Sequence, residues 1–344
     1  GLSAYAERVH DWPAERAART CGIAAADIRR AARLYATGAP AMAFHGLGVT
    51  EHVQGTDGVT ALINLALLTG NIGRPGTGVN PLRGQNNVQG AAHMGCDPRL
   101  LPGSTPLEQG RSSFEQAWRA VLPHTAGLDL MTMMDAAEAG RLKGLWAIGY
   151  DVFFTNPNAA TTARALGALD LVIVQDLFLT ETAREFGTVF LPAGSSFEKD
   201  GTFMNAERRI QRVRKAFDPR GGSRPDWQIM CGVAHAMGWQ DGFTFAQPEA
   251  IWNEIRMLCG GARGMTYARL DAGGLQWPCP SEDHPGTALL HQTTFGGRDR
   301  AELRWMDWAP SPEQVDEEFP LLLTTGRTLY QFNAGTMTGR TPNA

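Results

Sequence analysis

The sequence contains a loop in which one arginine stands among uncharged polar side chains. Residues 78–90 read GVNPLRGQNNVQG, and Arg83 is the charged residue among them. A guanidinium binds a carboxylate or a phosphate through a planar fork of donors, and it stays charged in any surroundings. Amide side chains follow it and add donors and acceptors without charge: Gln85, Asn86, Asn87 and Gln89. Such a loop could hold a small anion or a heteroaromatic ring, or its amides could brace its own backbone.

Polar and small residues also recur after three expected strands further along the chain. Segments 144–151, 170–176 and 188–194 read as strands, and segments 158–169 and 180–187 read as helices. Apolar strands that alternate with helices predict a parallel sheet covered on both faces, with ligands beyond the carboxyl ends of the strands. These ends carry Gly149, Tyr150, Asp151, Gln175, Asp176, Thr180, Gly194, Ser195 and Ser196. They could line a site, although loops between strands and helices are generally polar.

Two further patterns have both a structural and a functional interpretation. His93 and Cys96 form an HxxC pair, which without a second pair favours a structural role over a metal site. The basic side chains of segment 208–215 could face a phosphate, although a solvated surface is the more common reason for such a run. The sequence has no Walker A loop, no GxGxxG opening a helix, no HExxH and no GxSxG.

The elements before these loops are predicted from periodicity and from stop signals. Residues 56–71 give the clearest helical pattern, with Thr56 as the expected N-cap and Gly70 as the stop. A long loop is expected from residue 71 to about residue 110, and loops of that length within compact domains often have a function. Shorter elements are expected as helices at 12–22 and 26–38 and as a strand at 41–49.

The second half of the chain is expected to end in a new domain. Helices are predicted at 226–238 and 247–260, and residues 260–316 read as irregular. The charged segment 311–318 is the predicted domain boundary, because an apolar strand-like run begins directly after it.

Composition narrows the class of protein. The 344 residues carry 31 Lys and Arg against 35 Asp and Glu, a net charge of −4 with both signs scattered, which argues against a nucleic-acid partner. No apolar run is long enough to span a bilayer. The five cysteines lack a CxxC pair and predict buried thiols in a reducing compartment. The chain begins at Gly1 without a methionine, and we expect it to be a fragment of a longer protein.

Several long motifs in one order resemble the molybdopterin oxidoreductases of the formate dehydrogenase type. LTGNIGRPGTG and GVNPLRGQNNVQG are followed by LVIVQDLFLTETA, LPAGSSFEKDGTFMNAERRIQ, DWQI and LLLTTGRTLYQFNAGTMTGR. The resemblance covers essentially the whole chain. Within the family, GAAHMGCDP is similar to the catalytic alpha subunit of the soluble NAD-dependent formate dehydrogenases.

The resemblance implies a fold, a cofactor and a reaction. The fold is α/β, with parallel sheets flanked by helices in two interleaved lobes over residues 1–316 and the start of a β-barrel domain over 317–344. The cofactor is molybdenum or tungsten held by two molybdopterin guanine dinucleotides (bis-MGD), with a 4Fe-4S cluster upstream of this chain. Formate is oxidised to carbon dioxide by removal of its C–H hydrogen, and electrons leave through iron-sulfur and flavin-containing, NAD-reducing subunits. The expected location is the cytoplasm, without a membrane span.

Functional residues carry over only where the motifs match. Arg83 falls on the arginine that orients the formate carboxylate, and Gln85 falls on the amide beside it, near the pterin and the substrate. The resemblance implies a cofactor-lining role for Gly149, Asp151, Gln175, Asp176, Thr180, Glu198, Gly201, Thr202, Asn205, Arg208, Thr325, Arg327, Gln331, Thr336, Met337 and Thr338.

The sequence also departs from the family pattern and leaves alternatives open. The family's metal-ligating cysteine or selenocysteine, its neighbouring histidine and its cluster cysteines lie upstream, so no metal ligand is assigned here. Gln331 stands where some relatives have histidine. One alternative is an electron-transfer subunit that keeps the scaffold without the cofactor, and Arg83 and Gln85 argue against it. Another is a molybdoenzyme for a different small oxyanion such as nitrate, and the full Arg83 motif favours formate.

Overall fold

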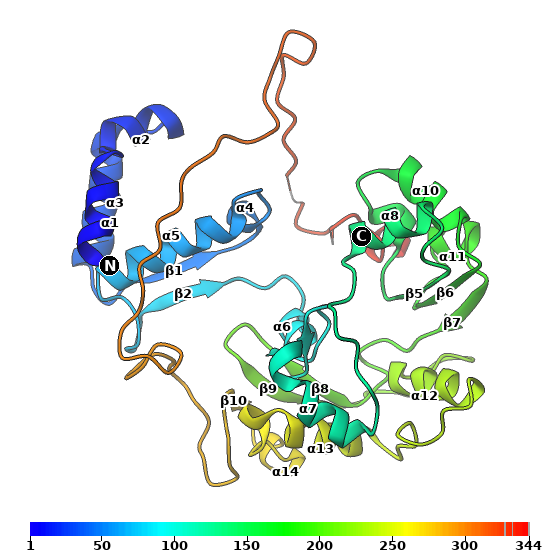
Figure 1. Cartoon of the computed structure of the whole chain (residues 1–344). Helices are drawn as coiled ribbons and strands as arrows, with labels where there is room; N and C mark the ends of the chain where they lie inside the picture. The colour runs from blue at the N-terminus through cyan, green and yellow to red at the C-terminus, as the bar shows by residue number, and fades with distance from the viewer. Residues whose placement is uncertain (327, 332, 343–344) are drawn as a thin grey trace. The chain divides into compact units, whose positions relative to one another are not determined.

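The computed structural model describes residues 1–326, 328–331 and 333–342, and the chain divides into two compact units (Figure 1). Unit 1 comprises Gly1–Asn86, Asn205–Glu207 and Thr287–Leu323. Unit 2 comprises Asn87–Met204, Arg208–Gly286 and Thr324–Ala344.

Unit 1 contains helices around a small parallel sheet. Its elements are α1 (Leu2–His10), α2 (Ala14–Cys21), α3 (Ala25–Thr37), β1 (Met42–His45), α4 (Leu47–Thr50), α5 (Gly55–Leu68) and β2 (Gly78–Pro81). Strands β1 and β2 pair in parallel, with Met42 opposite Gly78 and His45 opposite Pro81. The strand expected at 41–49 ends at His45, because glycines 46 and 48 weaken a strand and a helical turn follows instead.

Helix α5 lies close to its predicted position and holds an extended segment of the chain. It begins at Gly55 with Gln54 as the N-cap residue, so the expected Thr56 cap is wrong by two positions. Gln54 donates from Nε2 to the Asp307 carbonyl at 2.7 Å, and its Oε1 accepts from the Ala309 amide at 2.7 Å. Asn64 is 1% exposed and donates from Nδ2 to the Arg304 carbonyl at 2.7 Å. Two amide side chains therefore replace the strand partner that this backbone lacks.

Aromatic side chains add to the same attachment. Trp305 packs edge-to-face on Tyr5 with ring centroids 5.8 Å apart, and Trp308 packs on Trp12 at 5.9 Å. Arg8 pairs with Asp307 at 2.8 Å. We call residues 304–309 the strap, because these contacts fix an otherwise irregular segment to α1, α5 and Trp12.

The prediction of a continuous loop from residue 71 to about residue 110 is wrong in part. This segment contains β2 in unit 1, and in unit 2 it contains α6 (Val88–His93), β3 (Leu100–Leu101), β4 (Thr105–Pro106) and the start of α7 (Leu107–Trp118). These elements are short and are separated by glycine and proline, so their periodicity is too brief to read from sequence.

Unit 2 contains the larger α/β core. Its further elements are α8 (Leu130–Glu138), β5 (Gly144–Ile148), α9 (Val152–Thr155), α10 (Ala159–Gly167), β6 (Leu171–Asp176), α11 (Glu181–Glu185), β7 (Val189–Pro192), β8 (Gly201–Met204), β9 (Arg209–Val213), α12 (Asp226–Ala236), α13 (Pro248–Leu258), η1 (Gly260–Ala262), α14 (Tyr267–Leu270), β10 (Leu275–Gln276) and η2 (Thr338–Arg340).

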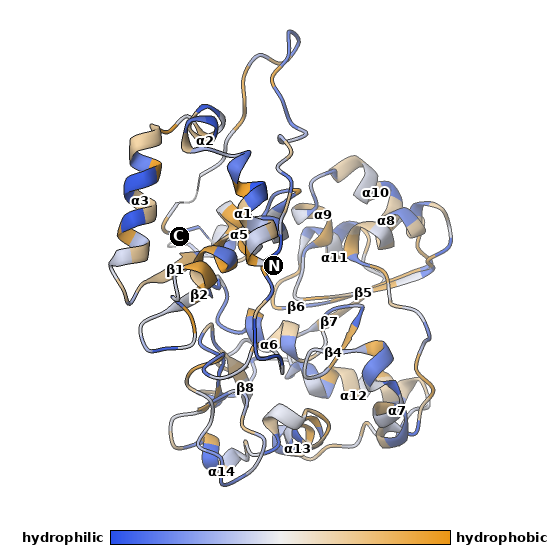
Figure 2. Cartoon of the chain, turned by 60° about the vertical axis from the view of Figure 1, so that its left-hand side comes forward, coloured by the Kyte–Doolittle hydropathy of each residue, from blue (hydrophilic) through white to orange (hydrophobic). Residues whose placement is uncertain are grey.

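Strands β5, β6 and β7 form the predicted parallel sheet in that order. The strands β5 and β6 are mainly hydrophobic (Figure 2). Val172 and Val174 pack with Ala183 of α11, whereas Gln175 donates to Asp226 of α12 at 2.8 Å. Because alternate side chains of a strand point to opposite faces, helices cover both sides of β6. The predicted α/β class with parallel sheets flanked by helices is confirmed.

A second core lies under the antiparallel sheet β10-β9-β8, which the sequence did not predict. Its buried side chains come mainly from β8, β9 and the helices that follow: Met204, Ile210, Trp252, Cys259, Ala262, Met265, Tyr267, Leu270 and Cys279. Cys259 and Cys279 are buried as expected, but Cys21 and Cys96 are exposed, which corrects the prediction that the thiols are buried.

The C-terminal segment does not begin as a strand in the described residues 317–326, 328–331 and 333–342. Leu321, Leu322 and Leu323 are 86%, 69% and 88% exposed. A barrel strand forms only with hydrogen-bonded neighbours, and no strand lies beside these residues in the described part of the chain. None of the described helices is both long enough and apolar enough to cross a membrane.

Candidate functional site

Arg83 lies just beyond the carboxyl end of β2 in unit 1. The Leu82 amide donates to the His45 carbonyl at 2.8 Å, which fixes the chain to the end of β1 before it turns into the loop. The side chains of Arg83 and Gln85 are exposed, and within the described residues they make no hydrogen bond or ion pair. The structure therefore leaves the guanidinium fork able to bind an anion at the edge where parallel sheets bind ligands.

His45 shares this edge, and sequence reasoning did not single it out. Its side chain is 8% exposed, and its Nδ1 has no hydrogen-bond partner among the described residues. His45 is the last residue of a short strand, so its burial depends on packing and gives no signal in the sequence.

One later amide of the motif, Asn87, braces a distant strand of the protein, whereas the alternative interpretation expected the amides to brace the loop's own backbone. Asn87 belongs to unit 2, and its Oδ1 accepts from the Met204 amide at 3.0 Å, joining the start of α6 to β8. A Cβ atom on Gly90 would lie 2.1 Å from this oxygen. Gly90 therefore permits the contact, and the motif combines an exposed stretch at residues 82–86 with a bracing contact at Asn87.

Asp151 lies at the carboxyl end of the sheet in unit 2, where its carboxylate holds the start of α11. It is 2% exposed, its Oδ1 accepts from the Thr182 hydroxyl at 2.6 Å and the Thr182 amide at 3.1 Å, and its Oδ2 accepts from the Glu181 amide at 3.2 Å. Burial acts to raise the pKa of Asp151, but the hydrogen bonds from Thr182 and Glu181 outweigh it and lower the pKa. Thr180 caps the same helix by accepting from the Ala183 amide at 3.3 Å.

Gln175 and Asp176 end the central strand β6. Gln175 is fully buried, and its Oε1 has no partner among the described residues although its Nε2 binds Asp226. Burial raises the pKa of Asp176, although hydrogen bonds from the Leu177 and Phe178 amides oppose the shift. A partly buried carboxylate in this position could accept hydrogen bonds from sugar hydroxyls or from a base.

The strand ends provide a test of whether a dinucleotide fits. Gly149 has φ +62°, its amide donates to the Gln175 carbonyl at 2.8 Å, and a Cβ atom there would meet nothing within 4 Å. Besides the Gln175 Oε1 acceptor, the buried Asn156 Nδ2 donor lacks a partner among the described residues. A buried unpaired polar group costs about 1–3 kcal/mol, so each of these two atoms is a candidate for a hydrogen bond with a bound ligand. The donor set fits the guanine dinucleotide that the resemblance implies.

The predicted residues of segment 198–208 are held by protein contacts. Glu198 accepts from the Ser195 amide at 2.7 Å and the Arg220 amide at 3.1 Å, and these bonds lower its pKa. Asn205 and Glu207 bond to each other at 3.1 Å. The remaining members of this group are two strand residues and a turn arginine: Gly201 and Thr202 begin β8, and Arg208 donates to the Trp277 carbonyl.

Neighbouring groups pair with much of the basic run. The Arg212 guanidinium lies 3.5 Å from the ring centroid of Tyr267, and Arg214 pairs with Asp271 at 2.6 Å. Lys215 pairs with Asp218 at 2.5 Å. These contacts give Arg212, Arg214 and Lys215 partners within unit 2, so a phosphate is not needed to explain these three side chains.

Four of the predicted C-terminal residues lie in or beside one turn of unit 2: Gln331, Thr336, Met337 and Thr338. The Thr338 hydroxyl donates to Gln331 Oε1 at 2.8 Å, and the Gly339 amide donates to the Gly335 carbonyl at 2.8 Å. Thr336 and Met337 lie between these residues, whereas Thr325 is exposed in the preceding segment. The prediction for Arg327 lies outside the described residues. Sequence reasoning missed Arg340, whose guanidinium contacts Glu181 at the start of α11.

His93 has the structural surroundings that the isolated HxxC pair suggested. It is 5% exposed, its Nδ1 lies 3.0 Å from the Ser104 hydroxyl, and its ring packs edge-to-face on Trp277 at 4.8 Å. Burial lowers the pKa of His93, so the ring is held neutral.

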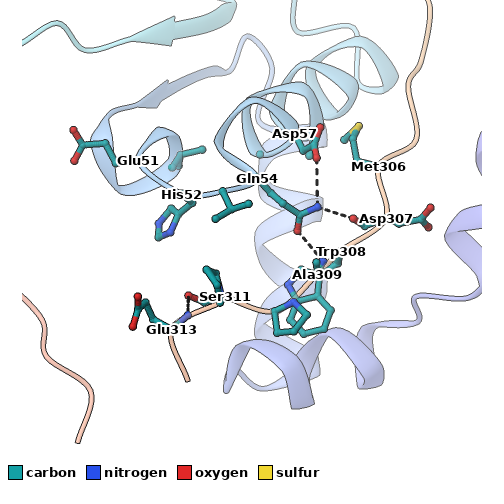
Figure 3. A pocket seen from close by; sticks show the side chains of 16 residues that line it. Glu51, His52, Gln54, Asp57, Met306, Asp307, Trp308, Ala309, Ser311 and Glu313 are labelled. Carbon is teal, nitrogen blue, oxygen red and sulfur yellow. Dashed lines mark hydrogen bonds between the residues drawn. The ribbon is translucent and has the colours of Figure 1, made fainter. Parts of the chain in front are cut away.

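A cavity of about 690 Å³ lies in unit 1 beside the strap (Figure 3). Residues of α4, α5 and segment 306–313 line it, including His52, Gln54 and Trp308. None of the residues predicted from the sequence to bind substrate or cofactor lines this cavity.

Comparison with known proteins identifies the class. The profile of the molybdopterin oxidoreductase family matches residues 9–236, a span that contains the Arg83 loop and the strand ends of β5 to β7. The chain belongs to this family, which confirms the family predicted from the motifs.

Particular relatives agree with this assignment. The chain is 41% identical to the F420-dependent formate dehydrogenase subunit alpha of Methanocaldococcus jannaschii over 345 residues, which is 100% of this chain and 51% of that protein. It is 36% identical to formate dehydrogenase H of Escherichia coli over 346 residues, 98% of this chain and 48% of that protein. The chain thus spans about half the length of the curated relatives it matches.

A solved structure supports the fold. Acetylene hydratase from Pelobacter acetylenicus is similar with a TM-score of 0.57 at 19% identity, covering 87% of this chain and 45% of that chain. At this identity the likeness concerns the fold alone.

Proposed function

We propose that the full-length protein oxidises formate to carbon dioxide, with bis-MGD and molybdenum or tungsten as its cofactor. The family membership supports a molybdopterin-type cofactor. The formate dehydrogenase names of the M. jannaschii and E. coli relatives support formate as the substrate.

The exposed, unpaired Arg83 is the observation that carries the proposal. Within the described residues its guanidinium has no protein partner, and its immediate neighbours are neutral. One fixed positive charge in a neutral frame suits a carboxylate with a single negative charge. Arg83 would bind and orient the two formate oxygens, and Gln85 would donate a hydrogen bond beside it, leaving the C–H bond pointing away from the guanidinium.

The cofactor would bind at the carboxyl edge of β5 and β6. Gly149 would let the backbone approach the dinucleotide, Gln175 and Asn156 would pair with its base, and Asp176 would accept from its hydroxyls. The bound cofactor supplies the redox chemistry, namely acceptance of the hydrogen and the electrons of formate. Further cofactor contacts are proposed for residues named by the resemblance: Asp151, Thr180, Glu198, Gly201, Thr202, Asn205, Arg208, Thr325, Arg327, Gln331, Thr336, Met337 and Thr338.

The remaining parts of the proposal concern segments outside this chain. A metal-ligating cysteine or selenocysteine and a 4Fe-4S cluster would lie upstream, and a β-barrel domain would begin near residue 317. Electrons would pass to iron-sulfur and flavin subunits in the cytoplasm and then to NAD. The name of the M. jannaschii relative makes F420 a second candidate acceptor.

The proposal is tested by expressing the full-length gene anaerobically and assaying the purified protein. We expect molybdenum or tungsten together with molybdopterin, and formate-dependent reduction of an artificial dye. A protein that lacks both metal and pterin would instead be the electron-transfer subunit without cofactor. A loaded protein that reduces nitrate and leaves formate untouched would be a different molybdoenzyme.

A further inference from the structure

Arg340 joins the C-terminal turn to the sheet of unit 2. Its guanidinium contacts Glu181 Oε2, lies 3.8 Å from Asp151 Oδ2, and lies 5.9 Å from the ring centroid of Phe178. Glu181 begins α11, Asp151 follows β5 and Phe178 follows β6. One side chain therefore spans both strand ends proposed to hold the dinucleotide.

The same guanidinium also shapes its own turn. Arg340 Nε donates to the Thr336 carbonyl at 3.0 Å, and the Arg340 amide donates to the Met337 carbonyl at 3.1 Å. Because Thr336, Met337 and Thr338 lie inside this turn, their position relative to the sheet depends on where Arg340 is anchored.

Charge explains why a cation belongs here. The Asp151 side chain is 1% exposed and that of Glu181 is 39% exposed, whereas the Arg340 side chain is 20% exposed. Two neighbouring carboxylates at a partly buried edge repel each other, and a cation between them offsets this repulsion. A lysine carries the same charge but no planar fork, so it could not reach both carboxylates and the Thr336 carbonyl together.

We propose that Arg340 is a positioning residue that fastens the Thr336–Thr338 turn to the dinucleotide-binding edge of the sheet. The inference rests on the proposed function for its consequence, which is cofactor retention. The contacts of Arg340 do not depend on formate being the substrate. The role of Arg340 and the proposed function can therefore be tested separately.

The test compares hydrogen exchange of residues 333–342 in full-length wild type, Arg340→Ala, Arg340→Lys and Glu181→Gln. Matched controls are Arg184→Ala and Glu185→Gln, which change exposed residues of α11 that lack partners among the described side chains. Loss of a charge-assisted contact should speed exchange in this turn about tenfold or more in Arg340→Ala, with incomplete rescue by lysine. Glu181→Gln removes the carboxylate partner but keeps the arginine, so hydrogen exchange in this turn should also become faster. This variant supplies the test if Arg340→Ala folds poorly.

Cofactor content gives the second measurement. Arg340→Ala and Glu181→Gln should retain less molybdopterin per chain than the two controls after dialysis. Exchange and cofactor content equal to those of the controls would overturn the role of Arg340. Wild-type protein without molybdopterin would overturn the proposed function, and the exchange comparison would then decide the role of Arg340 alone.

Discussion

Some polar side chains in this chain have hydrogen-bond partners within the protein, whereas others are exposed or unpaired. Asp151 uses both oxygens to hold α11, and Glu198 accepts two backbone amides. Arg83 lacks any such partner within the described residues, and Gln175 keeps one buried oxygen unpaired there. The unsatisfied groups are therefore the better candidates for ligand contact, since buried polar groups normally find partners in the protein.

His93 gives a prediction about pH. Burial lowers the pKa of His93, so the folded protein holds the ring neutral, while the unfolded chain protonates it below about pH 6.5. Stability should therefore fall on acidification, and His93→Gln should remove this contribution. Urea unfolding at pH 6.5 and pH 5.5 should show the wild type losing stability relative to the variant, by at most about 1 kcal/mol, because half of the unfolded rings are already protonated at pH 6.5. An unchanged difference between the two proteins would contradict the neutral, buried state of His93.

Among residues, sequence reasoning singled out Arg83 but not His45 or Arg340, and the role of Arg83 stays a prediction. Arg83 stands out because a charge among amides and glycines is visible in the sequence. Arg340 contacts Glu181 across 159 positions of the chain. A contact of that range has no local pattern, so only the folded structure reveals it.

Among elements, long periodic segments were predicted and short ones were not. Helix α5 and strand β6 were recognised because each carries an uninterrupted pattern that packing then satisfies. Strands β8 and β9 have mixed polar residues, and their pairing is fixed by the core beneath them. The C-terminal strand expected from residue 317 is absent from the described residues, since a strand pattern cannot act without a neighbour.

The attachment of the strap to α5 gives a prediction at the scale of elements. Asn64→Ala would leave the Arg304 carbonyl without its 2.7 Å donor, at a cost of about 1–3 kcal/mol. We expect trypsin to cut the folded Asn64→Ala variant after Arg304 about tenfold faster than it cuts the folded wild-type protein. The control is Thr56→Ala on the exposed side of the same helix. Equal cleavage in the two variants would show that Asn64 does not hold the strap.

At the scale of the whole molecule, the chain is an α/β member of the molybdopterin oxidoreductase family that spans about half of its relatives. Each of its two units contains a parallel sheet, and candidate site residues lie at the carboxyl edge of each sheet. The domain boundary predicted at residues 311–318 stays a prediction.

Thiol reactivity tests the burial pattern across the fold. Burial raises the pKa of Cys259 to about 11, whereas Cys96 of the same unit is exposed. Iodoacetamide at pH 8 should therefore label Cys96 and leave Cys259 unlabelled until the protein unfolds, because the thiolate is the reactive form. Peptide mass mapping provides the measurement, and rapid labelling of Cys259 in the native protein would argue against the core beneath β8 and β9.

The central claim is that Arg83 binds formate, and steady-state kinetics of the full-length enzyme test it most directly. Arg83→Ala should lose about 2–4 kcal/mol of transition-state stabilisation, a fall of roughly 30-fold to 1,000-fold in kcat/KM for formate. Metal and pterin content should stay at the wild-type level. Arg30→Ala, which removes an exposed arginine from α3, should keep the wild-type kcat/KM. A fully loaded Arg83→Ala enzyme with the same kcat/KM for formate as the wild type would contradict the account.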